Sequence, residues 1–191
     1  MFALPTNPSF GTLTVKPVNK ATDRPVIREI FRREFYGDDR LYYPDEGLWE
    51  IYDRMETEDA FGAYLVSRGD QVLFLLEVHP PIQMDLVSDY LTIPGTIGIY
   101  CFCYSRDATI HLPAFRACIG SLLSLPTISH ILTSLSHVTG DDPRASLLEN
   151  SGFSPLPAGS DKLSVYCCTK DSFDALYTSA RSGQFSSALP G

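Results

Sequence analysis

The sequence predicts an α/β (α+β) domain with one mixed, partly parallel twisted sheet of about seven strands, flanked by about four helices. Apolar runs with strand character alternate along the chain with segments of helical periodicity. Two runs, AYLVS and QVLFLLEVH, are separated only by Arg68-Gly69-Asp70, which indicates an antiparallel hairpin. Other strands are separated by a single helix, the usual connection between parallel neighbours.

The expected strands share alternating or continuous apolar residues and end at glycine, proline or polar turns. Pro80 and Pro81 end the third strand, because proline has no N–H to donate to a ladder. In chain order the expected strands cover residues 12–18, 63–67, 71–79, 96–105, 130–135, 153–156 and 162–169.

The expected helices carry apolar residues at a spacing of three or four. Thr22 or Asp23 is expected to cap the first helix, with Pro25 in its first turn. Pro113 is expected to open the third helix, and Pro126 to end it. The remaining helices are expected over Gly47–Glu58, within Asp142–Phe153, and over Asp171–Ser182.

The length of 191 residues suits one domain with a sizeable core. Residues 1–11 are polar and proline-rich and predict an extended arm, residues 12–169 form the predicted domain, and residues 170–191 predict a short helix with a loose tail. The net charge of −8 argues against general nucleic-acid binding, which needs a basic face. The apolar runs are too short to cross a membrane, and the N-terminus does not resemble a secretory signal, so we expect a cytoplasmic protein.

The five cysteines lie inside apolar runs, which predicts reduced, buried thiols. A metal site is the alternative, because Cys101 and Cys103 would share one face of a strand. Neither cysteine pair has the two-residue gap typical of zinc knuckles, so we expect no metal.

The stretch LLENSGF, Leu147–Phe153, predicts a helix that turns into a strand, with Gly152 as the left-handed residue after the helix. With the order of elements, it resembles the GNAT superfamily of N-acetyltransferases over roughly residues 12–169. The resemblance implies a site for acetyl-CoA, whose pyrophosphate is held by a glycine-rich loop between the fourth strand and the next helix. The corresponding residues here are Arg106–His111. Arg106 fits the pattern, Ser105 and Thr109 could also contact a phosphate, and Thr109 and His111 replace the glycines.

The resemblance also implies a tyrosine that returns a proton to the departing thiolate, but this position is Leu148. A general base is implied on the central strands. Glu77, near His79, is the candidate, and its alternative is a solvated or paired residue near a strand end.

Residues 36–59 hold nine acidic residues against Arg40 and Arg54, a local net charge of −7, together with several aromatic residues. This segment is either a surface for a cationic acceptor or basic protein, or a solvated helix face over core aromatics. The candidate surface residues are Asp38, Asp39, Tyr42, Tyr43, Asp45, Glu46 and Trp49.

The sequence therefore favours a GNAT-like protein that has lost acetyl-CoA chemistry, needs no cofactor, and serves as a structural or interaction module. It is similar in length, and in its degenerate loop, to short GNAT-like proteins of tailed bacteriophages, some of which are virion components. Such a protein would bind a protein partner or oligomerise, through both termini and the acidic segment. The alternative is an active acetyl-CoA-dependent N-acetyltransferase acting on a cationic amine or basic peptide.

Overall fold

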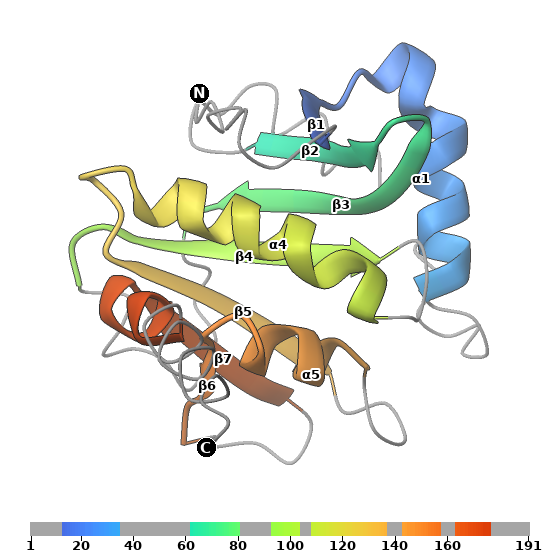
Figure 1. Cartoon of the computed structure of the whole chain (residues 1–191). Coiled ribbons are helices and arrows are strands. Elements are labelled where there is room, and N and C mark those ends of the chain that lie inside the picture. Colours follow the sequence, from blue (N-terminus) through green and yellow to red (C-terminus); the bar gives the residue numbers. More distant parts are fainter. Residues whose placement is uncertain are drawn as a thin grey trace, which may run out of the picture.

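A computed structural model describes residues 13–34, 62–80, 93–103, 108–136, 143–157 and 163–176 of the chain. These residues form a seven-stranded sheet in the order β1-β2-β3-β4-β5-β7-β6 (Figure 1). The strands are β1 (Leu13–Pro17), β2 (Gly62–Arg68), β3 (Gln71–His79), β4 (Thr96–Cys103), β5 (His130–Ser136), β6 (Ser154–Pro155) and β7 (Leu163–Thr169). The predicted fold class is confirmed, as is the hairpin of β2 and β3 around Gly69, whose φ is 57°.

The sheet is antiparallel except between β4 and β5, which run parallel. These two strands pair only at their beginnings, from Thr96 with His130 to Gly98 with Leu132. Beyond these pairs β4 continues to Cys103 beside β3, and β5 continues to Ser136 beside β7. The two ribbons separate in Figure 1. Beyond their three pairs, β4 stays paired with β3 and β5 stays paired with β7, while β4 and β5 no longer pair with each other. The divergence creates a cleft in the middle of the sheet.

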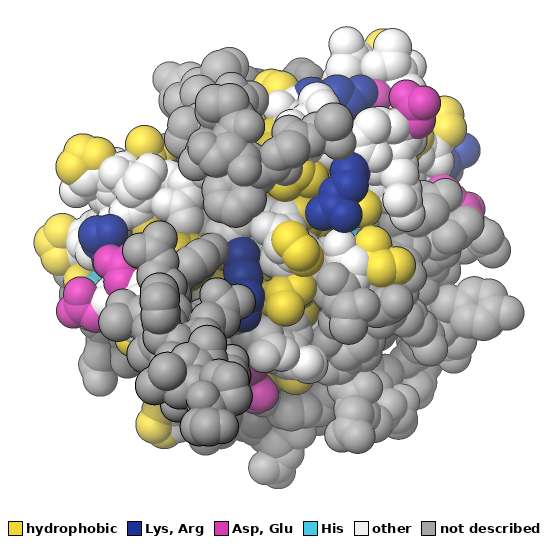
Figure 2. Space-filling model, in the orientation of Figure 1, with side chains coloured by type: hydrophobic (Ala, Val, Ile, Leu, Met, Phe, Trp, Pro, Cys, Tyr) yellow, Lys and Arg dark blue, Asp and Glu magenta, His cyan; other side chains and the backbone are white. Residues whose placement is uncertain are grey.

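Helices cover both faces of the sheet. Helix α1 (Lys20–Glu34) packs Ile27 and Ile30 against Leu65 and Leu75, all at most 1% exposed. Helices α4 (Ala108–Leu123) and α5 (Pro143–Glu149) lie on the other face, over the larger apolar cluster. On the side seen in Figure 2, the basic side chains of the described residues lie apart rather than in one patch. No helix among the described residues is long and apolar enough to cross a membrane.

The cap of α1 differs from the prediction. Asn19 caps the helix instead of Thr22 or Asp23, since its side-chain oxygen accepts a hydrogen bond from the Ala21 N–H at 3.0 Å. Asp23 lies in the first turn and accepts hydrogen bonds from the Asn19 N–H and from Lys16 Nζ, at 2.9 and 2.7 Å. Burial raises the pKa of Asp23, but these hydrogen bonds and the charge of Lys16 outweigh burial, so the pKa is lowered overall.

Helix α4 begins at Ala108, not at Pro113, and ends at Leu123, before Pro126. The helix starts earlier because His111, Phe115 and Cys118 lie on one buried stripe at helical spacing. Pro113 is on the exposed side of the helix. Its ring therefore points away from the core, although a proline inside a helix removes one hydrogen bond and crowds the carbonyl four residues earlier.

The helical segment after β7 packs on α4 through Phe173. Residues 170–176 are helical, and Phe173 is 7% exposed within the core. Its ring lies so close to Gly120 of α4 that a Cβ there would be 3.0 Å away. The arm at 1–11, the helix Gly47–Glu58, the tail after 176 and the rest of the helix predicted over Asp171–Ser182 lie outside the described residues.

Candidate functional site

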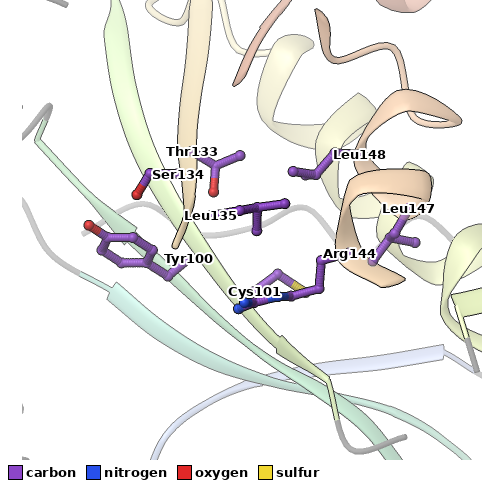
Figure 3. A pocket seen from close by; sticks show the side chains of 8 residues that line it. All are labelled: Tyr100, Cys101, Thr133, Ser134, Leu135, Arg144, Leu147 and Leu148. Atoms are coloured by element: carbon purple, nitrogen blue, oxygen red, sulfur yellow. The ribbon is translucent and has the colours of Figure 1, made fainter. Parts of the chain in front are cut away.

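A hollow opens where β4 and β5 diverge, and α5 forms its third wall (Figure 3). Its lining residues come from all three elements: Tyr100, Cys101, Thr133, Ser134, Leu135, Arg144, Leu147 and Leu148. Figure 3 shows Tyr100 and Ser134 on one side of the two strands, and Cys101, Thr133 and Leu135 on the side of α5. The volume is about 20 Å³, little more than one water molecule needs.

The α5 side of the cleft is apolar and closely packed. Leu147 and Leu148 are 2% and 3% exposed, and Leu148 points from α5 toward β5. The end of α5 is fixed, because the Leu148 carbonyl accepts hydrogen bonds from the Ser151 and Phe153 N–H groups at 2.8 and 3.1 Å. Gly152 has a φ of 88°, as the sequence predicts for the left-handed residue of this turn. The implied proton-donor position is therefore filled by a buried leucine.

The side of the sheet that faces α1 is polar at the same level. Glu77 of β3 lies opposite Tyr100 of β4 in the antiparallel register, and His79 lies opposite Gly98. These side chains follow Leu75 on the α1 face at alternate positions of β3. Glu77 is 6% exposed, so of the two alternatives predicted for it, a solvated or a paired residue near a strand end, the solvated one is wrong. Its register partners are Ala63 of β2 and Tyr100 of β4.

His79 is held in one orientation by its neighbours. Its ring centroid is 4.9 Å from that of Tyr100, at an interplanar angle of 30°. Nδ1 donates a hydrogen bond to the Pro80 carbonyl at 2.7 Å, which places the proton of a neutral ring on Nδ1. Burial lowers the pKa of His79, and the bond to Pro80 opposes that shift only in part. His79 is therefore neutral at physiological pH.

The residues of the implied phosphate loop lie partly in α4. Ser105 and Arg106 lie outside the described residues, and Thr109 belongs to the first turn of α4. His111 is inside the helix, 1% exposed, with its ring 6.2 Å from that of Phe74. Residues 108–111 are therefore helical and His111 belongs to the core, while the phosphate contacts implied for Ser105, Arg106 and Thr109 stay a prediction. Leu148 lines a hollow of about 20 Å³, which has room for about one water molecule.

The described cysteines are unreactive or half-buried. Burial raises the pKa of Cys118 and Cys168 to about 12, and that of Cys167 to about 11. Cys101 is half-buried at the cleft. No group of three or more histidine, cysteine or acidic residues that could hold a metal occurs among the residues the structure describes. The acidic surface predicted within residues 36–59 is outside that part of the chain.

Sequence reasoning missed two residues of the cleft. Tyr100 lies in the apolar run IYCFCY, which gives no signal in the sequence that one of its residues borders a cleft. Arg144 lies in the first turn of α5, and its side chain extends toward Cys101 of β4 in Figure 3. An arginine in a short helix gives no signal in the sequence that it faces a cleft.

No model of a known protein family and no curated protein matches the sequence. Solved structures do match. A complex of aminoglycoside acetyltransferase AAC(6')-Ib with coenzyme A aligns with a TM-score of 0.65 at 13% identity, over 85% of this chain and 98% of that one. An acetyltransferase from Thermus thermophilus aligns with a TM-score of 0.60 at 17% identity, over 83% of this chain and 97% of that one. The chain has the GNAT fold.

A third GNAT-fold match is a spermidine N-acetyltransferase chimera from Vibrio cholerae and hSSAT, with a TM-score of 0.62 at 12% identity, over 85% of this chain and 98% of that one. The resemblance seen in LLENSGF and in the order of elements is thereby confirmed for the fold. Identities this low carry over the GNAT architecture and no individual residue role.

Proposed function

We propose that this GNAT-fold protein does not transfer acetyl groups from acetyl-CoA and serves as an interaction or structural module. The observation that carries the proposal is Leu148, which is 3% exposed and closes the α5 side of the cleft. A leucine supplies no proton to a leaving thiolate, and it occupies space that an acyl donor would need. The position of His111 in the core supports the same reading, because it removes part of the implied phosphate cradle.

Calorimetric titration with acetyl-CoA tests this proposal. We expect no binding heat for the wild-type chain at millimolar ligand, while AAC(6')-Ib measured in parallel serves as the positive control. Micromolar binding by the wild type that is lost in Arg106→Ala would overturn the proposal. The variant Leu148→Ala separates the causes: if it alone gains binding, the leucine side chain is what closes the cleft.

The second candidate that we propose is an N-acetyltransferase acting on a cationic amine. Glu77 is buried beside Tyr100, at the level where β4 and β5 separate. A buried carboxylate costs stability unless it is paired, and a carboxylate near a cleft is suited to take a proton from an ammonium group. Two structural neighbours are an aminoglycoside and a spermidine acetyltransferase. Coenzyme A release from acetyl-CoA with spermidine, abolished in Glu77→Gln, would establish this candidate.

The place of such a module in a bacteriophage particle remains a proposal that rests on the sequence. Mass spectrometry of purified particles tests it if the gene lies among head and tail genes. Peptides of this chain at a fixed copy number per particle would support a virion component.

A further inference from the structure

We infer that the helical segment after β7, residues 170–176, is a strap that opens and closes while the rest of the domain stays folded. The inference goes beyond the proposed function and does not depend on it, because it concerns the local stability of one segment and not a reaction. It rests on three observations: one buried anchor, a close fit between two glycines, and a buried hydroxyl group that lacks a hydrogen bond.

A single buried side chain anchors the strap. Phe173 is 7% exposed within the main apolar cluster, whereas Lys170, Asp171, Asp174 and Ala175 are exposed. An isolated helix shorter than about 12 to 15 residues is marginal in water, so the strap stays ordered only through its contacts with the domain. Segments with few buried apolar contacts open at a lower free energy than the core does. We therefore expect the strap to open before the domain unfolds.

The closed strap fits closely between α4 and the turn after α5. A Cβ at Gly120 would lie 3.0 Å from the Phe173 ring, and a Cβ at Gly152 would lie 3.1 Å from Phe173 Cα. The Ser172 hydroxyl donates a hydrogen bond to the Gly152 carbonyl at 2.9 Å. The hydroxyl oxygens of Ser172 and Thr169 also accept hydrogen bonds from each other's backbone N–H groups, at 3.0 and 3.2 Å. These contacts give the strap one defined closed state to which it can return.

One buried polar group opposes the closed state. Ser151, next to Gly152, is 0% exposed, and its hydroxyl has no hydrogen-bond partner among the described residues. The free-energy cost of burying such a hydroxyl is recovered when water reaches it. The Ser151 carbonyl accepts a hydrogen bond from Cys168 Sγ at 3.8 Å, and the same sulfur lies 3.8 Å from Ser172 Oγ of the strap. An opening that admits water to this joint relieves the cost and uncovers the Cys168 thiol.

Native-state thiol labelling of the full chain tests the inference. Cys168 touches the strap and is 0% exposed, and Cys118 of α4, at 4% exposed, is the internal reference. Methyl methanethiosulfonate labels each thiol only when it is exposed, and tandem mass spectrometry follows the two sites. Relative to each thiol's rate in the unfolded chain, we expect Cys168 to be labelled about tenfold faster than Cys118, or more. Its labelling should also depend less on urea, since local opening exposes less surface than global unfolding does.

The variant Ile27→Val separates local from global opening. Ile27 is 0% exposed in the α1 cluster, on the other face of the sheet, and its truncation should accelerate Cys118 labelling about two- to tenfold. Cys168 labelling should stay as in the wild type, because opening of the strap leaves the α1 cluster intact. Phe173→Leu should accelerate Cys168 labelling by about fivefold or more, since it weakens the anchor of the closed state.

Equal labelling of Cys168 and Cys118 in the wild type, with equal dependence on urea, would overturn the inference. Acceleration of both thiols by the same factor in Ile27→Val would also overturn it, because Cys168 would then be exposed only by global unfolding. If Phe173→Leu does not fold, the wild-type and Ile27→Val measurements still decide, since neither changes the strap.

Discussion

The two sides of the sheet at the divergence of β4 and β5 differ in the kind of side chain that they bury. On the α5 side, Leu135, Leu147 and Leu148 are buried and belong to or border the main apolar cluster. Burial of apolar area explains each of them without any function. On the α1 side, Glu77 and His79 are buried as well, but they are polar. Their burial opposes folding unless partners compensate, so packing alone does not explain why they are there.

The difference indicates where function is to be sought in this fold. The resemblance implies an acid and an acyl donor on the α5 side. The leucine side chains there belong to the core, and Arg144 is the charged residue among the described residues that line the hollow. The α1 side keeps groups able to hold or move a proton. Substitutions on the two sides should therefore affect stability in different ways, and the following experiments compare them.

The largest effect is expected on the α5 side. Leu148→Ala should lower the free energy of unfolding by about 2–4 kcal/mol, because it removes buried methyl groups and enlarges an existing hollow. Urea denaturation followed by circular dichroism measures the change. Leu156→Ala is the control, since Leu156 is only half-buried beyond β6 and should cost less. Equal costs for the two variants would contradict the assignment of Leu148 to the core.

A smaller effect is expected from Gly98→Ala on the α1 side. A Cβ at Gly98 would lie 2.6 Å from His79 Nδ1, so the ring must move and lose its contact with Tyr100. We expect a loss of about 1–3 kcal/mol in the free energy of unfolding. Gly69→Ala is the matched control. It has open space around it and should cost about 1 kcal/mol, only because its φ is 57°.

A double-mutant cycle isolates the cause of the Gly98→Ala effect. In a His79→Ala background the new Cβ meets no ring, so Gly98→Ala should cost markedly less than in the wild type. Additive losses in the double variant would mean that the close approach of His79 to the Gly98 backbone is not what requires the glycine.

The smallest effect is expected from pH. Burial lowers the pKa of folded His79 below its ordinary value of 6.5, so the unfolded chain takes up the proton first as the pH falls. The contribution of neutral His79 to the free energy of unfolding is therefore complete above pH 6.5. It is lost as the pH falls from 6.5 toward the pKa of the folded state. Its slope cannot exceed about 1.4 kcal/mol per pH unit for one proton. Urea unfolding between pH 5 and 8 should show this slope in the wild type and a flatter curve in His79→Gln. An unchanged slope would show that His79 is not the titrating group.

The sequence by itself determined the strands, the hairpin and the turn after α5. These depend on local features, namely runs of apolar residues, Arg68-Gly69-Asp70, and a glycine at residue 152 where the backbone must be left-handed. The sequence also identified Leu148 as the residue at which the resemblance implies an acid, because that position has a fixed distance from Gly152. It misplaced the start of α4, since Pro113 is a strong local signal for a first turn.

Only the tertiary structure decided what the local signals leave open. His111 is in the core because α4 packs that side of the helix on Phe74 of β3, and no local rule fixes which helix face meets the sheet. Glu77 lies buried on a central strand between β2 and β4, and Tyr100 lies opposite it through a register that pairs distant segments. Arg144 borders a cleft because β4 and β5 separate after three pairs. Contacts between segments far apart in the chain set burial and proximity, and these two properties determine what the side chains can do.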